Sequence, residues 1–209
     1  GAREIDAKGK AVAPGFINML SWSNQSLIAD GRGLSELRQG VTLEVMGEGD
    51  SMGPLNPEMK AFEQKRQGDI KYPVTWTTLD QYLTFLAKKG VSVNVASFVG
   101  AATVRIHELG EGDVDPTPAQ LERMRALVKG AMEDGAMGVD SSIIYAPGTY
   151  AETSELAALE ASLATHGEVD AGKVEAIRQA ILDGRLSVDS AAIADKMLAA
   201  AATWLGKTS

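Results

Sequence analysis

The sequence predicts an α/β fold, in which a partial (β/α) barrel of about four strands over residues 1–152 is followed by an all-helical segment over residues 153–209. Strand-like and helix-like segments alternate through the first two-thirds of the chain, which is the pattern of βαβ units and a parallel sheet. After Thr153 the strand pattern stops, and amphipathic stretches separated by Gly167 and Gly184 predict helices. Four strands are half of a closed eight-stranded barrel, so we expect two open sheet edges.

Four strands are predicted from apolar and β-branched runs. The first lies within residues 10–20, where an apolar run continues past a Pro-Gly break and predicts a buried strand. The second covers residues 41–46 and stops at Gly47. The third, residues 91–99, has the clearest pattern, and a fourth short strand begins in residues 137–140.

Helices are predicted between these strands from apolar spacing and from capping residues. Residues 33–40 predict a short helix that Gly40 terminates. Thr78 is a favourable N-cap for a helix through Lys89, and residues 118–134 form a strong amphipathic pattern. Residues 48–77 are polar and contain three prolines, so this stretch is expected to connect the second strand to the next helix without regular structure.

Composition excludes several classes of function. The net charge of −8 argues against a nucleic-acid surface, because phosphate binding requires clustered Lys and Arg. No apolar run approaches the ~20 residues that span a bilayer, and the N-terminus lacks a signal-peptide pattern. The chain has no Cys, which excludes disulfides and thiolate ligands and fits a reducing compartment. A soluble cytoplasmic protein is therefore expected.

Five motifs, taken in order, resemble the N-acyl-D-amino-acid deacylase branch of the amidohydrolase superfamily. They are residues 6–17 (DAKGKAVAPGFI), 38–42 (RQGVT), 94–100 (NVASFVG), 135–142 (GAMGVDSS) and 144–151 (IYAPGTYA). The resemblance covers roughly residues 5–156. It implies a metal-dependent (β/α)8 barrel with Zn²⁺, in which a metal-activated hydroxide hydrolyses the amide of an N-acyl-D-amino acid.

The positions that hold the metal in that family are altered in this sequence. The first strand of such enzymes closes on a His-x-His or His-x-Asp pair, and the two positions are Leu20 and Trp22 in this chain. The family's cysteine-containing turn after the second strand is represented by Gly-Glu-Gly-Asp. Glu48 and Asp50 are therefore the candidate metal ligands, with a solvated acidic loop as the alternative.

Two further residues match substrate-binding positions of the family. Tyr145 corresponds to a tyrosine that helps to bind the substrate's carboxylate, with ordinary packing beside a Pro-Gly turn as the alternative. Arg105 is kept in a turn whose histidine is absent. The chain has only two histidines, His107 and His166, and a metal site needs three or more converging ligands. No catalytic residue is assigned, and we expect that this chain does not hydrolyse amides by itself.

The C-terminal part resembles a different family, the flagellar anti-sigma factors, over about residues 155–200. That resemblance implies a negative regulator of flagellar transcription that binds a flagellar sigma factor through amphipathic helices. The apolar residues expected to contact the partner are Ile177, Ile181, Ile193, Met197 and Leu198. Two alternatives remain open: these helices cover the open face of the partial barrel, or the chain is a fragment without autonomous function that needs a partner or a homo-oligomer to cover its sheet edges.

Overall fold

The structure is a computed structural model, and it describes residues 6–163 and Gln179. The chain divides into two compact units, residues 1–166 and 167–209. The first unit is a mixed α/β structure, as the sequence predicts. In chain order its elements are β1 (Phe16–Asn18), α1 (Ser26–Ala29), α2 (Leu34–Arg38), β2 (Val41–Met46), α3 (Pro57–Arg66), α4 (Leu79–Lys89), β3 (Asn94–Ser97), β4 (Val99–Gly100), α5 (Ala101–Leu109), α6 (Pro118–Glu133), β5 (Val139–Asp140), the 3-10 helix η1 (Gly148–Tyr150) and α7 (Thr153–Ala161).

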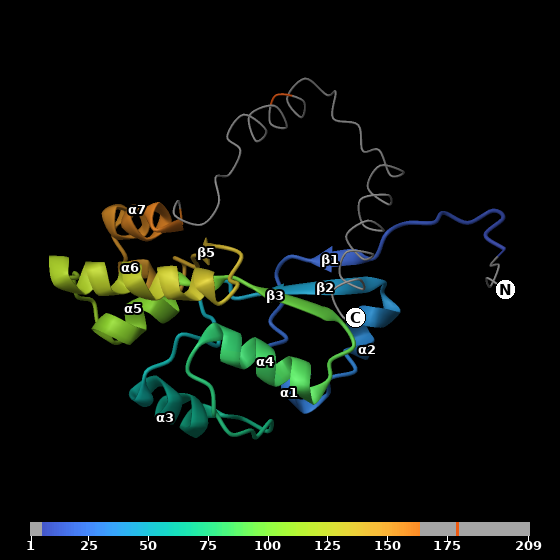
Figure 1. The fold of residues 1–209 in the computed structure, drawn as a ribbon, viewed down its shortest axis with the longest axis horizontal. Coiled ribbons are helices and arrows are strands. Elements are labelled where there is room, and N and C mark those ends of the chain that lie inside the picture. The colour runs from blue at the N-terminus through green and yellow to red at the C-terminus, as the bar shows by residue number, and fades with distance from the viewer. Residues whose placement is uncertain (1–5, 164–178, 180–209) are drawn as a thin grey trace, which may run out of the picture. The chain divides into compact units, whose positions relative to one another are not determined.

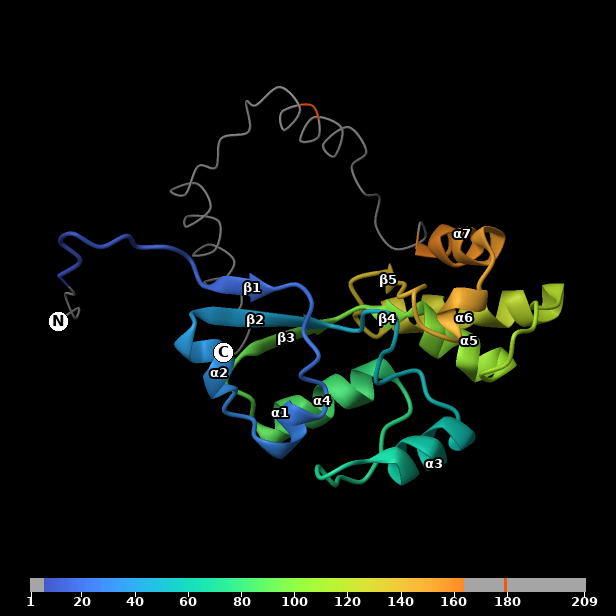
Figure 2. The same cartoon turned by 180° about the vertical axis from the view of Figure 1, so that it is seen from behind.

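All strand pairs of the described part are parallel. One sheet has the order β1-β2-β3 (Figure 1), and a second, shorter sheet pairs β4 with β5 (Figure 2). Phe98 alone separates β3 from β4, and its N–H donates to the carbonyl of Met46 at 2.8 Å. The two sheets therefore follow each other through one interrupted strand, and the predicted strand at residues 91–99 is confirmed in this broken form.

The helices α1, α2 and α4 lie on one side of the β1-β2-β3 sheet (Figures 1 and 2). Two of them supply much of the core beneath it, with Leu27 and Ile28 from α1 and Leu79, Tyr82 and Leu86 from α4. A parallel sheet usually has helices as its cover because the crossover connections place them there. This is the packing expected of successive βαβ units.

Two of the predicted helices begin at a capping box. The hydroxyl of Thr78 accepts the N–H of Gln81 at the start of α4, and the side chain of Gln81 accepts the N–H of Thr78 in return. Thr117 and Gln120 make the same reciprocal arrangement at the start of α6. Such caps satisfy N–H groups that have no partner inside the helix, and they fix where each helix begins.

Two local predictions are wrong. The first strand is not buried, since it is short and Phe16 and Ile17 are more than half exposed at the outer edge of the sheet. The stretch 48–77 is not irregular throughout, because Pro57–Arg66 forms α3. It also carries the buried ring of Trp76, which stacks on Tyr72 with centroids 6.0 Å apart. The apolar core therefore includes part of residues 48–77, although the polar composition of this stretch did not predict it.

None of the helices in the described part of the chain is long and apolar enough to cross a membrane. The last described helix, α7, belongs to the first unit, where Glu155 and Leu159 are buried. The segment at its end meets α6, as the bond from Arg125 Nε to Ser162 Oγ at 3.3 Å shows. The boundary between residues 152 and 153 stays a prediction, and the helices expected after residue 166 lie outside the described residues.

Candidate functional site

The loops after β2 and β5 meet around Gly49, together with the first turn of α5, which directly follows β4. The N–H of Ala102 donates to the carbonyl of Gly49 at 2.9 Å. A Cβ atom on Gly49 would lie 2.4 Å from the Cβ of Ser142, so these two loops are in close contact. Since the carboxyl ends of parallel strands form the usual ligand-binding edge of an α/β sheet, this junction is the candidate site.

Asp50 is held in this junction by protein groups. The hydroxyl of Thr103 donates to Asp50 Oδ1 at 2.8 Å, and the N–H of Ser51 donates to the same hydroxyl at 2.7 Å. Arg66 Nη2 lies 3.5 Å from Asp50 Oδ2 and also pairs with Glu63. Although partial burial lowers the pKa of Arg66, the bond to Glu63 and the charge of Asp50 raise that pKa overall. Both oxygens of Asp50 thus face donors that would compete with a bound cation.

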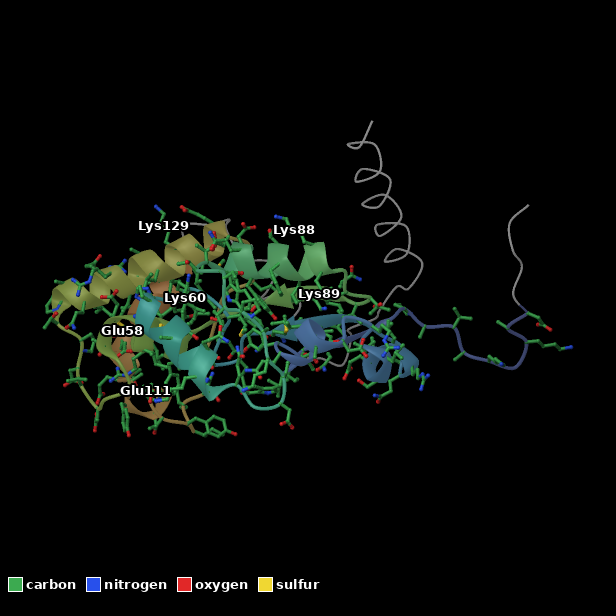
Figure 3. All side chains as sticks on the ribbon, turned by 90° about the horizontal axis from the view of Figure 1, so that it is seen from below. Glu58, Lys60, Lys88, Lys89, Glu111 and Lys129 are labelled. Atoms are coloured by element: carbon green, nitrogen blue, oxygen red, sulfur yellow. The ribbon has the colours of Figure 1, made fainter. Side chains whose placement is uncertain are left out.

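A cavity of about 330 Å³ lies beside Asp50, between the turn after β2 and the helices α3 and α5. Its lining combines apolar side chains with four carboxylates and one guanidinium. Glu58 and Glu111, which come from α3 and from the turn after α5, are labelled in Figure 3. An excess of carboxylates makes the local potential negative, which favours a cationic group over an anionic one. The main lining residues are the apolar Leu55, Met59, Phe62 and Ile106, and the charged Asp50, Glu58, Glu63, Glu111 and Arg66.

The two residues predicted to bind substrate are placed differently. Tyr145 lies in the loop after β5, where its N–H donates to the carbonyl of Ser142 and the residue is 59% exposed. Arg105 is 1% exposed on α5. Its Nη1 atom lies 2.5 Å from Glu155 Oε2, and its Nη2 donates to the carbonyl of Val114 at 2.6 Å. Tyr145 therefore shares the junction around Gly49, whereas the guanidinium of Arg105 is bound by α7 and the loop after α5. Both substrate-binding roles stay predictions.

The sequence alone did not single out Glu44, the buried acid of β2. Its Oε2 accepts the hydroxyl of Ser21 at 2.6 Å, while its buried Oε1 has no hydrogen-bond partner in the described part. Tyr82 adds a second bond to this region, from its hydroxyl to the carbonyl of Asn24 at 2.9 Å. Together these bonds fix the segment after β1. The only sequence pattern that could have indicated a buried Glu44 is its position within the β-branched run of residues 41–46.

The chain is similar over most of its length to curated deacylases of N-acyl-D-amino acids. It is 32% identical over 195 residues to the N-acyl-D-aspartate deacylase of Alcaligenes xylosoxydans xylosoxydans, a match that covers 88% of this chain and 39% of that enzyme. The D-aminoacylase of the same organism is 29% identical over 169 residues, which are 79% of this chain and 34% of the enzyme. The resemblance to the D-aminoacylases is confirmed. The chain spans about two-fifths, or less, of the length of these relatives.

Solved structures agree with this relationship. An N-acyl-D-glutamate deacylase from Bordetella bronchiseptica, complexed with zinc and a phosphonate inhibitor, matches with a TM-score of 0.66 and 28% identity over 77% of this chain and 34% of that one. A D-aminoacylase with a binuclear metal centre matches with a TM-score of 0.62 and 28% identity over 74% of this chain and 32% of that one. A family model, the anti-sigma-28 factor FlgM, matches residues 151–199. The amidohydrolase-like and anti-sigma-like resemblances are therefore both supported.

The donor atoms in the described part of this chain do not fit the metal of the D-aminoacylases. Leu20 and Trp22, which follow β1, carry no donor atom that binds a divalent ion, and both are more than half exposed. Within residues 6–163 no three His, Cys, Asp or Glu side chains converge in a way that could hold a metal. Glu48 and Asp50 therefore remain two carboxylates without a third ligand in that part of the chain.

Among the described residues, the remaining candidate His107 does not supply a third ligand. His107 lies on α5, with its Nδ1 atom 3.2 Å from Glu108 Oε1. His166 lies outside the described residues, as do the five residues expected to contact a partner. Those five are Ile177, Ile181, Ile193, Met197 and Leu198. Their role stays a prediction.

Proposed function

We propose that this chain is an amidohydrolase-like protein that keeps part of the D-aminoacylase fold, a partial (β/α) barrel, and does not by itself catalyse the metal-dependent hydrolysis of N-acyl-D-amino acids. The observation that carries the proposal is the donor set at the carboxyl ends of the strands. Two carboxylates, Glu48 and Asp50, stand there without a converging third ligand among residues 6–163, and Asp50 is bound by Thr103. A zinc-bound hydroxide needs three protein ligands and an open position.

Electrostatics support the same proposal. N-acyl-D-aspartate and N-acyl-D-glutamate, the substrates named for the relatives, carry carboxylates and are anions at neutral pH. The cavity beside Asp50 is lined by more carboxylates than cations. Arg105, the cation that the resemblance suggests for an anionic substrate, is buried against Glu155. Anionic substrates would therefore meet an unfavourable potential at this cavity.

Metal analysis and an activity assay test this proposal together. The purified 209-residue chain is dialysed against excess Zn²⁺ and then against metal-free buffer, and bound zinc is measured by mass spectrometry. In parallel, release of the free amino acid from N-acetyl-D-glutamate is followed. We expect far less than one zinc per chain and no rate above the buffer blank. One zinc per chain that Glu48→Gln and Asp50→Asn both remove, together with turnover, would refute the proposal.

A second candidate function rests on the family model that covers residues 151–199. We propose that this segment binds a flagellar sigma factor through the apolar faces of its amphipathic stretches, in the manner of a helix that lies in an apolar groove. Ile177 and Ile181 are spaced by four residues, so a helical conformation would place them on one face. The proposed outcome is sequestration of the sigma factor.

Binding of the full chain to a purified flagellar sigma factor tests this second function. We expect a complex in calorimetry at micromolar concentrations, and Ile181→Asp is expected to weaken it at least tenfold. Gln179→Asp, at a position where the side chain is exposed, serves as the charge-matched control and is expected to change affinity little. No detectable complex at micromolar concentrations would exclude this function.

A further inference from the structure

Exposed apolar side chains gather on β1 and in the segments that flank β1 and β5, the outermost strands of the two sheets. In the described part of the chain, nine of the thirteen exposed large hydrophobic residues belong to residues 16–22 or 137–145. These two segments contain β1, β5 and the loops that follow them. Monomeric proteins rarely leave such groups of apolar side chains in water. The nine residues are Phe16, Ile17, Met19, Leu20, Trp22, Met137, Ile143, Ile144 and Tyr145.

The same two segments are nearly free of charge. They contain one charged residue, Asp140, although 23% of the chain is charged and its net charge is −8. Two identical acidic molecules repel each other, and the repulsion is weakest when the surfaces that meet carry few charges. A low charge together with a high apolar content is therefore what a contact between two copies requires.

Both segments also present an unpaired strand edge. Among the described residues β1 pairs only with β2, and β5 pairs only with β4, so each has one edge without a strand partner. All strand pairs are parallel, and β3 continues into β4, so β1 and β5 run in the same direction. An edge of this kind is a template for pairing with another chain.

We propose that a second copy of this chain covers this surface, with β1 of each molecule beside the partner's β5. One two-fold axis then makes both contacts at once, because every copy supplies both edges. If β3 and β4 count as one interrupted strand, the two copies form a ring of eight parallel strands, which is the number that closes a parallel sheet with helices outside. The interface is isologous, and no other protein is needed to close it.

The available area suits a stable dimer. Nine side chains of this size, each half or more exposed, offer on the order of 900 Å² per copy, and a standard interface buries about 800 Å² per partner. Dimer formation does not depend on the proposed lack of catalysis. Failure of one proposal therefore leaves the other standing.

Sedimentation velocity of the full chain is the first test. We expect a species with twice the chain mass of 22.0 kDa that dissociates on dilution. Ile17→Lys and Ile144→Lys, one on each segment, are each expected to raise the dimer dissociation constant at least tenfold. Val114→Lys is the matched control, because Val114 is also half exposed but lies between α5 and α6. Circular dichroism checks that each variant is folded.

Two results of that experiment would overturn the proposal. One is that the unmodified chain sediments as a monomer even when its loading concentration is far above the dissociation constant of an ordinary stable dimer. The other is a dimer whose dissociation constant both folded edge variants leave unchanged, which would place the contact elsewhere, for example in residues 167–209.

Cross-linking tests the pairing of unlike edges. The chain has no Cys, so introduced thiols are unique. Asn18→Cys on β1 and Asp140→Cys on β5 are prepared as separate variants and treated with a short bismaleimide. We expect a covalent dimer when the two variants are mixed, and little when either is treated alone. Equal cross-linking of each variant alone would show that like edges meet, and it would refute the eight-stranded arrangement.

Discussion

Replacing Glu155 with Gln is expected to destabilise the first unit far more than a surface substitution does. Glu155 on α7 and Arg105 on α5 are 3% and 1% exposed, and their charged atoms lie 2.5 Å apart. The guanidinium has one other bonded partner, the carbonyl of Val114, and its Nε atom has none in the described part. In Glu155→Gln the positive charge of Arg105 stays buried with neutral acceptors only, the introduced amide oxygen and the carbonyl of Val114, and this is unfavourable in a low-dielectric interior.

The size of the effect follows from that geometry. Removal of one partner from a buried ion pair costs about 3–5 kcal/mol, and the carbonyl of Val114 offsets part of this, so we expect about 3 kcal/mol. Each kcal/mol lowers the melting temperature of a unit of this size by about 2–4 °C. Glu155→Gln is therefore expected to lower the midpoint by about 6–12 °C. The double variant Arg105→Met/Glu155→Leu removes both charges and is expected to recover most of the lost stability.

Urea unfolding followed by far-ultraviolet circular dichroism measures these differences in the free energy of unfolding. Glu122→Gln provides the control, because Glu122 pairs with Arg125 on the surface of α6 and such a pair contributes about 0–1 kcal/mol. A loss below about 1 kcal/mol for Glu155→Gln would refute the reasoning. So would a double variant that is as unstable as the sum of the two single changes, since the two charges would then act independently.

Three further substitutions test the fold locally. Gly47→Ala is expected to cost several kcal/mol, because φ is +94° there and a Cβ atom would lie 2.2 Å from the carbonyl oxygen of Phe98. Gly90 has a similar φ of +84° but open space around it, so Gly90→Ala is expected to cost only about 1–2 kcal/mol in the same urea titration. Burial raises the pKa of the Tyr82 phenol above its ordinary value of 10.0, so the folded state keeps a proton that the unfolded state releases. Stability is then expected to fall as pH rises above about 10, with a shallower fall for Tyr82→Phe in unfolding curves at about pH 8 and pH 10.5. Thr117→Ala removes the cap of α6 and is expected to cost about 1 kcal/mol in thermal unfolding, and an unchanged midpoint would contradict the role of the capping box.

Local chemistry explains which elements the sequence could predict. The strand Val41–Met46 has β-branched residues between two glycines, and the structure has the same bounds. The helix from Leu79 to Lys89 is bounded by Thr78 and Gly90, which act within one turn of its ends. In contrast, α3 has no apolar stripe, and only Met59 is buried along it. Its available signal was Asn56 before a proline, a cap whose side chain accepts the N–H of Met59 at 2.8 Å.

Long-range contacts explain what the sequence could not predict. Glu48 and Asp50 directly follow the second strand, and this alone predicts that they lie at the carboxyl end of the sheet. The donor to Asp50, however, is Thr103, which lies 53 residues further along the chain. The partner of Arg105 lies 50 residues away on α7. Exposure of the first strand also depends on what covers it, and the apolar pattern of residues 10–20 carries no information about that.

The helix α7 lies where the two resemblances meet, and this has an energetic consequence. The anti-sigma family model begins at residue 151, so it includes α7 at Thr153–Ala161. The structure packs the same helix into the first unit, with Leu159 fully buried and Glu155 bound to Arg105. If a sigma factor takes up α7, binding must break that ion pair, and the free energy of the pair is subtracted from the affinity.

Affinity measurements on Glu155→Gln test this coupling. Loss of the ion pair makes α7 easier to release, so the variant is expected to bind the sigma factor more tightly than the unmodified chain does. Recovery of about 1.4 kcal/mol of the pair's free energy corresponds to a tenfold gain in affinity. Glu122→Gln, which leaves α7 in place, is expected to leave the affinity unchanged. Equal affinity of Glu155→Gln and the unmodified chain would mean that residues after α7 bind the partner alone. In that case α7 serves only the amidohydrolase-like unit, since its buried side chains stay bound to α5 and α6 throughout.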